Sequence, residues 1–464
     1  MLSALGRFSD WFRWELQTLK FVARPVLWLY HSRKTVVGEP TFGGGRIVAF
    51  SHPFHLLDPA HVHLALGRGR LYYLADSVIL FGTPRTAWMS RRCRALPLHR
   101  RESGKTDRGS QRENARFLQE AIQHLATGSS VAIAPEGRST AQRSLWRFKA
   151  GLCRLAFETA KEHDWPDDLR VVLVGLTYRR MRRPYDGSLT VAIDEAVSVN
   201  DWRDRHERDA RQTDREFLDH LEERMRALTA DFGDLPPGFV EDLAELLDAD
   251  DRARGNKLER DDRVTLRRAV AILRTVDRKD PASWTDFKRD LSQWLSDADH
   301  LLVRPGSDGL APRIPPIVTL ALEVPTLLGF LLWWPAFLRA RAVSAQIAKQ
   351  RKPKHRSRAG TQELFAIVRV FALWFVVWNA LAASLWLGGL LPAWGFLTTV
   401  LGLLALGALA RKRHRHARLA WLRLCRSTAL ADFSRRGDAL RRKVRTLESE
   451  EPSEPRLSPA PSDP

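Results

Sequence analysis

Residues 47–59 read IVAFSHPFHLLDP, an apolar run followed by a segment with two histidines and an aspartate. The run 47–50 predicts a short buried strand, and 51–59 predicts a turn bounded by proline. Groups that bind or react tend to lie on loops at strand ends of α/β sheets. An imidazole beside a carboxylate is a general base that the carboxylate orients. Taken alone, the segment fits equally well a plain turn in which Asp58 bonds the main chain.

Around this stretch, short β-rich runs alternate with helical runs through residues 35–200, which predicts an α/β domain. A helix is expected to begin at the capping box Ser110–Glu113 and to end at Gly128. A second helix is expected near 148–161. The further strands are expected at 71–75, 95–98, 131–134, 171–177 and 189–193.

The flanking regions differ in composition. Residues 1–34 carry a helical apolar stripe and tryptophans among basic residues, typical of an amphipathic membrane-associated helix or of a helix packed on its own domain. Residues 201–312 are highly charged and without strand signals, which predicts a helical insert. Its helices are expected around 217–228, 237–249, 262–277 and 284–299. Residues 413–464 predict a basic helix and a disordered tail.

Residues 313–412 are the apolar part of the chain and contain the runs 317–338, 364–387 and 390–410. Each run is about long enough to cross a hydrocarbon core of roughly 30 Å. The last two are joined by Gly388-Gly389 and predict a membrane helical hairpin. The flanks of this hairpin are basic, so both of its ends and the α/β domain are expected on the cytoplasmic face. The first run has two prolines and Glu323, which favours a re-entrant or interfacial segment.

The charge balance narrows the partners. The chain has a formal net charge of +20, which indicates a polyanionic partner, either nucleic acid or anionic membrane lipids. Because the basic linker lies beside apolar runs, lipid headgroups are expected and nucleic acid is not. The three cysteines form no metal-binding or disulfide pattern, and the sequence has no GxxxxGK[ST], GxSxG or HExxH motif. No metal and no cofactor is therefore expected.

Further motifs lie at the expected strand ends of the α/β domain. They are LPLHR at 96–100, APEGRS at 134–139, FKAG at 148–151 and VVLVGLTY at 171–178. With the histidine segment, these blocks resemble in order and spacing the glycerolipid acyltransferases, which include the lysophosphatidic acid and glycerol-3-phosphate acyltransferases. The resemblance covers roughly residues 15–200. It implies a mixed sheet flanked by helices.

The resemblance also implies roles for single residues. His52 falls on the family's general base, and Asp58 falls on the partner of that base. Arg100 falls on an arginine of the block that binds the acceptor. The family's PEG loop, implied to bind the acceptor phosphate, corresponds to the segment of Glu136, Gly137, Arg138 and Ser139.

The sequence departs from the family pattern at two positions. The usual pattern has four residues between the histidine and the aspartate, whereas five residues separate His52 from Asp58. Ser51 also stands where asparagine is common. His55 lies nearer to Asp58 in sequence and competes for the role of base. We favour His52 because it directly follows the strand and precedes proline, as in the family.

These observations predict a membrane-bound O-acyltransferase. The donor is expected to be acyl-CoA or acyl-carrier protein, and the acceptor a glycerol phosphate or lysophospholipid, as in a 1-acylglycerol-3-phosphate O-acyltransferase. One alternative is a glycerol-3-phosphate O-acyltransferase. Another is a non-catalytic membrane scaffold with a decayed acyltransferase domain, which the intact His52, Asp58 and Glu136 disfavour.

Overall fold

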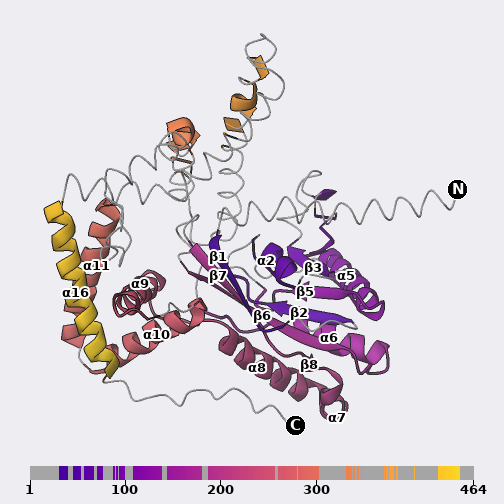
Figure 1. The fold of residues 1–464 in the computed structure, drawn as a ribbon. Coiled ribbons are helices and arrows are strands. Elements are labelled where there is room, and N and C mark those ends of the chain that lie inside the picture. Colours follow the sequence, from indigo (N-terminus) through magenta and orange to yellow (C-terminus); the bar gives the residue numbers. More distant parts are fainter. Residues whose placement is uncertain are drawn as a thin grey trace. The chain divides into compact units, whose positions relative to one another are not determined.

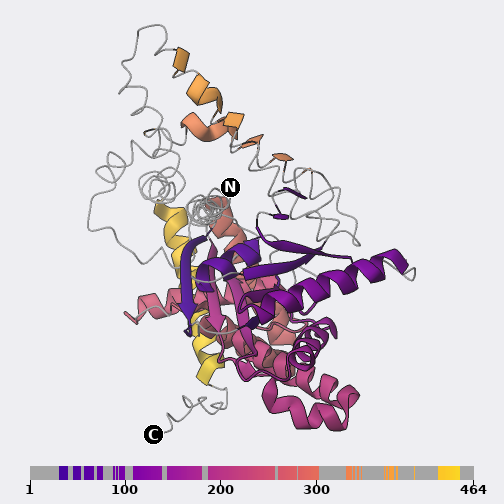
Figure 2. The same ribbon diagram turned by 90° about the vertical axis from the view of Figure 1, so that its right-hand side faces the viewer.

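The protein is seen here in a computed structural model (Figures 1 and 2). The structure describes residues 31–39, 45–53, 57–66, 71–76, 87–88, 90–91, 93–99, 108–137, 144–179, 187–256, 260–279, 281–301, 331–336, 338–339, 342–343, 346, 370, 373–374, 376–380, 383–384, 402 and 427–449. The chain divides into two compact units. The first comprises Met1–Gly233, Asp261–Arg263 and Ala340–Val370, and the second comprises Asp234–Arg260, Val264–Arg339 and Phe371–Pro464.

The first unit contains a mixed sheet with the strand order β1-β7-β6-β2-β5-β3-β4, and β8 pairs with β6. The strands β2 to β6 run parallel wherever they pair with one another, whereas β7 is antiparallel to β6, and β1 is parallel to β7. The strands are β1 (His31–Val37), β2 (Arg46–Phe50), β3 (Leu71–Asp76), β4 (Ala95–Leu98), β5 (Ser130–Ile133), β6 (Arg170–Arg179), β7 (Gly187–Ile193) and β8 (Val197–Ser198).

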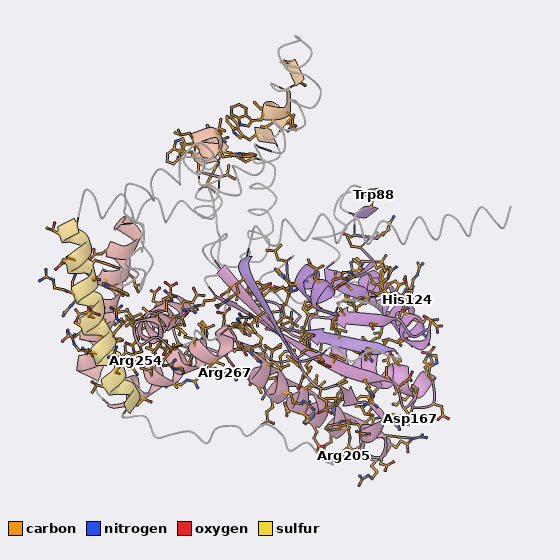
Figure 3. All side chains as sticks on the ribbon, in the orientation of Figure 1. Trp88, His124, Asp167, Arg205, Arg254 and Arg267 are labelled. Carbon is orange, nitrogen blue, oxygen red and sulfur yellow. The ribbon has the colours of Figure 1, made fainter. Side chains whose placement is uncertain are left out.

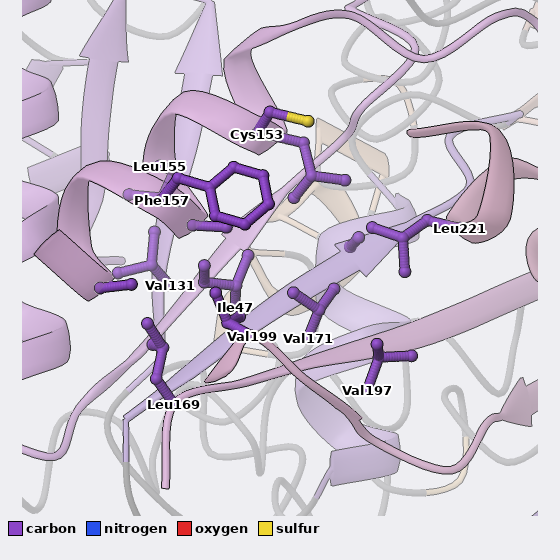
Figure 4. Close-up of a cluster of buried hydrophobic side chains, with 14 of the residues drawn as sticks. Ile47, Val131, Cys153, Leu155, Phe157, Leu169, Val171, Val197, Val199 and Leu221 are labelled. Carbon is purple, nitrogen blue, oxygen red and sulfur yellow. The ribbon is translucent and has the colours of Figure 1, made fainter. Parts of the chain in front are cut away.

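Helices cover both faces of this sheet. The helices α5 (Arg108–Ala126), α6 (Gly151–Glu162) and α8 (Ala210–Leu228) cover one face, and α2 (Leu57–Leu66) covers the other. Side chains alternate between the two faces of a strand. Accordingly Ile47 and Ala49 join the larger apolar cluster (Figure 4), whereas Val48 and Phe50 join the cluster that includes Val62 of α2.

Gly175 allows α8 to approach the sheet closely. A Cβ atom built on Gly175 would lie 2.6 Å from the carbonyl oxygen of Leu228, the last residue of α8. This is shorter than a van der Waals contact, so only glycine fits at this point of β6. At the end of α5, Gly128 adopts a φ of +74°, which is the left-handed conformation that glycine supplies after a helix.

Most elements lie where the sequence predicts them. The predicted strands correspond to β2–β7, and the helix that ends at Gly128 corresponds to α5. Three predictions are wrong in detail. The chain enters the sheet at β1 from His31, before the expected boundary at 35, and the segment after Leu57 is the helix α2 rather than a turn. The helix α5 begins at Arg108, so Ser110 lies inside its first turn and is not its N-cap.

The charged region is helical, as the sequence predicts. It contains a 3₁₀ turn (Asn200–Trp202), α7 (Arg203–Arg208), α8, α9 (Pro237–Ala253), α10 (Asp262–Lys279) and α11 (Pro281–Leu301). In the second unit, α16 (Ser427–Ser449) packs on α9 and α11. The indole N–H of Trp294 donates to the carbonyl of Phe433 at 3.0 Å, and the two rings stack.

None of the helices within the described ranges is long and apolar enough to cross a bilayer. Most of the predicted hairpin at 364–410 lies outside those ranges, as do residues 1–30 of the predicted amphipathic helix and the end of the tail. In the apolar region that is described, the indole N–H of Trp374 donates to the carbonyl of Leu332 at 3.0 Å. The hairpin and the amphipathic helix therefore stay predictions.

Candidate active site

The imidazole of His52 bonds the carboxylate of Asp58 at the carboxyl end of β2. The distance between His52 Nδ1 and Asp58 Oδ2 is 2.9 Å. The side chain of Asp58 is fully buried, whereas that of His52 is 18 % exposed. Asp58 is in the first turn of α2, where the positive end of the helix dipole favours a carboxylate. The two side chains meet even though five residues separate them in the sequence.

Asp58 also accepts a hydrogen bond from Tyr178 on β6. The hydroxyl of Tyr178 lies 2.5 Å from Oδ1, the carboxylate oxygen that does not contact His52. The tyrosine is fully buried, and its ring lies 6.0 Å from the ring of His61, edge to face. Each oxygen of the Asp58 carboxylate therefore has a donor, as a buried carboxylate requires.

Glu136 links the loop after β5 to the histidine. Its Oε1 accepts the main-chain N–H of His52, and its Oε2 accepts the main-chain N–H of Trp146, both at 3.2 Å. Burial raises the pKa of Glu136, and the two main-chain hydrogen bonds partly offset that effect. The carboxylate thus joins the histidine segment, 84 positions away, to the chain at Trp146, ten positions after it.

Two main-chain hydrogen bonds hold the turn at 135–137. Gly137 has a φ of +64°, and its N–H donates to the carbonyl of Ala134 at 3.0 Å. The N–H of Lys149 donates to the carbonyl of Pro135 at 2.9 Å. The FKAG segment at 148–151 therefore lies directly against the PEG segment at 135–137.

Ser51 connects the histidine segment to β6. Its hydroxyl accepts the N–H of Leu176 at 2.8 Å, and its own N–H donates to the carbonyl of Val174 at 3.1 Å. These bonds continue the β2–β6 ladder for one residue beyond β2. Serine here extends the strand pairing up to His52 and fixes where the imidazole leaves the sheet.

The chain after β4 is fixed by α5. The side chain of Asn114 accepts the N–H of His99 at 2.7 Å and donates to the carbonyl of His99 at 2.8 Å. The ring of His99 also lies 2.8 Å from a carboxylate oxygen of Glu113. The predicted acceptor residue Arg100 is the next residue, and it lies outside the described residues.

The structure thus brings His52, Asp58, Glu136 and the main chain of Gly137 together at one edge of the sheet. Arg138, Ser139 and the competing His55 are, like Arg100, outside the described residues. Within the described ranges, no group of three or more histidine, cysteine or acidic side chains is arranged to hold a metal ion. The arrangement provides an oriented imidazole whose Nε2 remains to take a proton from a substrate.

Tyr178 and Ser51 are site residues to which the sequence assigned no role. Tyr178 stands at the end of VVLVGLTY, where strand alternation predicts a core residue facing one side of the sheet. Its contact with Asp58 joins residues 120 positions apart. Asp58 can be recognised in the sequence because it is an acid at a strand end. The strand order that brings Tyr178 to it cannot be read from the sequence.

A buried ion cluster lies on the opposite face of the same strands. Asp262 lies 2.5 Å from the guanidinium of Arg33 and 3.8 Å from that of Arg179. Its main-chain N–H donates to the hydroxyl of Thr190 at 3.1 Å. Because Arg33 and Arg179 both align with Ser188 of β7, their side chains emerge on one face. The cluster connects β1, β7 and β6.

Comparison with protein families agrees with this geometry. Residues 31–177 match the family model named Acyltransferase. The matched range contains the histidine and aspartate of the pair and the glutamate that joins them to the loop after β5. This part of the chain is therefore an acyltransferase domain of the glycerolipid acyltransferase family. No curated protein matches the chain.

Proposed function

We propose that the protein moves a fatty acyl group from an acyl thioester to a hydroxyl of a glycerol phosphate or lysophospholipid, as a 1-acylglycerol-3-phosphate O-acyltransferase does. The observation that carries the proposal is the His52–Asp58 pair at the carboxyl end of β2, with a Glu136 that joins it to the loop after β5. An acyltransferase domain supports the reaction type. The acceptor class is our inference from the resemblance of the motifs.

The pair performs general base catalysis in this proposal. With its Nδ1–H donated to Asp58, His52 takes the proton of the acceptor hydroxyl at Nε2. The hydroxyl oxygen attacks the thioester carbonyl carbon and forms a tetrahedral oxyanion. When this intermediate collapses, the carbon–sulfur bond breaks and the thiolate takes the proton back from the imidazolium. The acceptor is the nucleophile, so no acyl-enzyme forms.

Two arginines of the motifs are suited to a phosphorylated acceptor. Arg100 and Arg138 are the groups that we propose to neutralise the acceptor phosphate, because guanidinium groups bind phosphate bidentately. Glu136 is an acid and so offers a phosphate no positive charge, and its two oxygens already accept main-chain N–H groups. We therefore propose that Glu136 serves the acceptor site indirectly, by joining the His52 segment to the loop that continues into Arg138 and Ser139.

We propose further that the enzyme works at a membrane, with its acyltransferase domain on the cytoplasmic face. The net charge of +20 and the apolar runs between 313 and 412 support this. The donor is acyl-CoA or acyl-carrier protein. Glycerol 3-phosphate as acceptor is the alternative within the class, and a non-catalytic scaffold is the alternative outside it.

A histidine substitution tests the base. His52→Ala removes the group that takes the proton, so we expect acyl transfer to fall by about a hundredfold to ten-thousandfold. The substitution also removes the donor of one oxygen of the buried Asp58, so the melting temperature should fall, and circular dichroism checks that the variant is folded. The assay measures transfer of a labelled acyl group from acyl-CoA or acyl-carrier protein to a panel of glycerol-phosphate and lyso-lipid acceptors.

The matched control is His220→Ala on α8, which removes a histidine from the opposite side of the sheet. This control should transfer acyl groups at the wild-type rate. Undiminished transfer by His52→Ala would exclude His52 as the base, and His55→Ala would then be the next variant to measure. Wild-type protein that acylates no acceptor in the panel would favour the scaffold.

A further inference from the structure

We infer that Tyr178 is a positioning residue for the base, acting through Asp58. The inference rests on the proposed function and concerns the last residue of the VVLVGLTY block, to which the resemblance assigns no role. Tyr178 lies one residue beyond the range that matches the Acyltransferase family model. The structure makes it the end of a chain of hydrogen bonds, Tyr178–Asp58–His52.

Two hydrogen bonds, one to each carboxylate oxygen, hold the plane of the Asp58 carboxylate. Oδ2 is 2.9 Å from Nδ1 of His52, and Oδ1 is 2.5 Å from the hydroxyl of Tyr178. A carboxylate with one donor can rotate about its Cβ–Cγ bond, whereas one with a donor on each oxygen cannot do so without losing a bond. The tyrosine hydroxyl thereby sets the direction in which Asp58 presents Oδ2 to the imidazole.

The hydroxyl is itself firmly placed. The tyrosine is fully buried in the apolar cluster beneath α2, where it packs among side chains of β6, β7 and α2. The ring of His61 meets it edge to face. Because β6 continues past the end of β2, its residue 178 reaches the start of α2, where Asp58 lies. Moving a ring packed in this way away from Asp58 would cost free energy, because the surrounding side chains would have to move as well.

The bond also affects charge. Asp58 is fully buried, and a hydrogen bond to an ionised acceptor is stronger than one between neutral groups. The Tyr178 hydroxyl takes part of the negative charge of the carboxylate. Without it, more of this charge acts on His52 and stabilises the protonated imidazole, which cannot serve as the base at the start of the reaction.

The test is Tyr178→Phe, which removes only the hydroxyl. The pH dependence of kcat and of the KM for the acceptor is measured with the full chain. We expect kcat to fall about tenfold to a hundredfold, the range that follows from losing one hydrogen bond to a charged group. The KM for the acceptor should change less than about twofold. The acid limb of the kcat profile should move to higher pH.

Tyr73→Phe is a matched control. The hydroxyl of Tyr73 also bonds α2, but it donates to the main-chain carbonyl of Pro59 at 3.2 Å and not to Asp58. Both variants lose one tyrosine hydroxyl that braces the same helix. A role in folding alone would lower the melting temperature in both and leave both acid limbs in place. An acid limb of Tyr178→Phe that stays at the wild-type position, or one that Tyr73→Phe shifts equally, would overturn the inference.

A second measurement does not depend on acyl transfer. Diethyl pyrocarbonate modifies the neutral imidazole, and peptide mass spectrometry follows His52 in a background in which His55 is asparagine. The pH at which His52 becomes reactive should rise in Tyr178→Phe and stay unchanged in Tyr73→Phe. If the wild type acylates no acceptor, the proposed function fails, and this measurement still decides whether Tyr178 acts on His52.

Discussion

Glu136 is a buried acid that bonds two main-chain N–H groups, and this combination makes its charge matter for stability. Burial raises its pKa, so the folded protein binds the proton more tightly than the unfolded chain does. The stability from this carboxyl is therefore complete below its ordinary pKa of 4.5 and is lost as the pH rises through the raised value. Burial makes ionisation of this carboxyl costly, and its two hydrogen bonds partly offset that cost.

Glu136→Gln tests this at the residue scale. A glutamine offers one oxygen, so one of the two N–H groups of His52 and Trp146 loses its acceptor at every pH. We expect acyl transfer to fall about tenfold, because an unpaired buried donor costs about 1–3 kcal/mol and loosens the His52 segment. The melting temperature of the wild type should exceed that of the variant most at acid pH, and this difference should narrow as the pH rises above 4.5.

The control is Glu158→Gln on α6, whose carboxylate lies at the surface beside Arg154. The difference between its melting temperature and that of the wild type should not narrow as the pH rises above 4.5. A difference for Glu136→Gln that widens with rising pH would contradict the raised pKa.

Residues with chemical signals could be predicted from the sequence, and residues that act by position could not. His52, Asp58 and Glu136 stand out because histidine and acids at strand ends are informative. Ser51 and Tyr178 carry no such signal, because serine and tyrosine occur throughout proteins. Their roles arise from β6 lying beside β2, a pairing that joins residues more than 120 positions apart.

At the scale of elements, the strands with continuous apolar runs were predictable and the others were not. β2 and β6 read as buried strands, and they are. β1 contains Arg33 and Lys34 and lies at the edge of the sheet, so its sequence lacks the apolar run of a central strand. α2 was interpreted as a turn because of Pro59, but proline is tolerated in the first turn of a helix, where its missing N–H has no helical partner.

The contact between β6 and α8 yields a prediction for an element. Gly175→Ala places a methyl group 2.6 Å from the carbonyl oxygen of Leu228. Because both atoms lie on regular elements, α8 must shift, and we expect the free energy of unfolding to fall by about 1–3 kcal/mol. Denaturant unfolding followed by circular dichroism measures this change.

Gly151→Ala on α6 is the matched control, since a Cβ atom there meets nothing within 4 Å. It should leave the unfolding midpoint unchanged or raise it slightly, because alanine favours helix. Equal midpoints for the two variants would mean that α8 does not need the glycine at position 175.

At the scale of the whole molecule, the excess of basic residues is spread over several helices. Figure 3 labels three of these basic residues, which are Arg205 of α7, Arg267 of α10 and Arg254 after α9. Many arginines have carboxylate partners, such as Arg445 with Asp250 and Arg436 with Asp297. The net charge of +20 thus coexists with many ion pairs. Composition alone predicted a polyanionic partner but not which surface would meet it.

Salt extraction distinguishes the two ways in which such a chain could attach to a membrane. At 1 M salt the Debye length is about 3 Å, so adhesion of basic side chains to lipid headgroups is largely screened. Apolar runs embedded in the hydrocarbon do not depend on ionic strength. We expect the protein to remain with sedimented membranes after a 1 M sodium chloride wash, as immunoblotting of pellet and supernatant would show. Complete release would mean that attachment is electrostatic alone.

The ion cluster around Asp262 bears on how the chain folds during synthesis. Asp262 lies 229 residues after Arg33, the side chain that it bonds in the first strand. When the ribosome has synthesised the chain up to residue 233, all the described strands of the sheet have been made. Asp262, which pairs with Arg33 and Arg179, has not yet been synthesised. The domain therefore reaches its full stability only after the chain has been extended past 262. A shortened form that ends at 200, where the sequence marks the end of the α/β region, would never gain the ion pairs with Asp262.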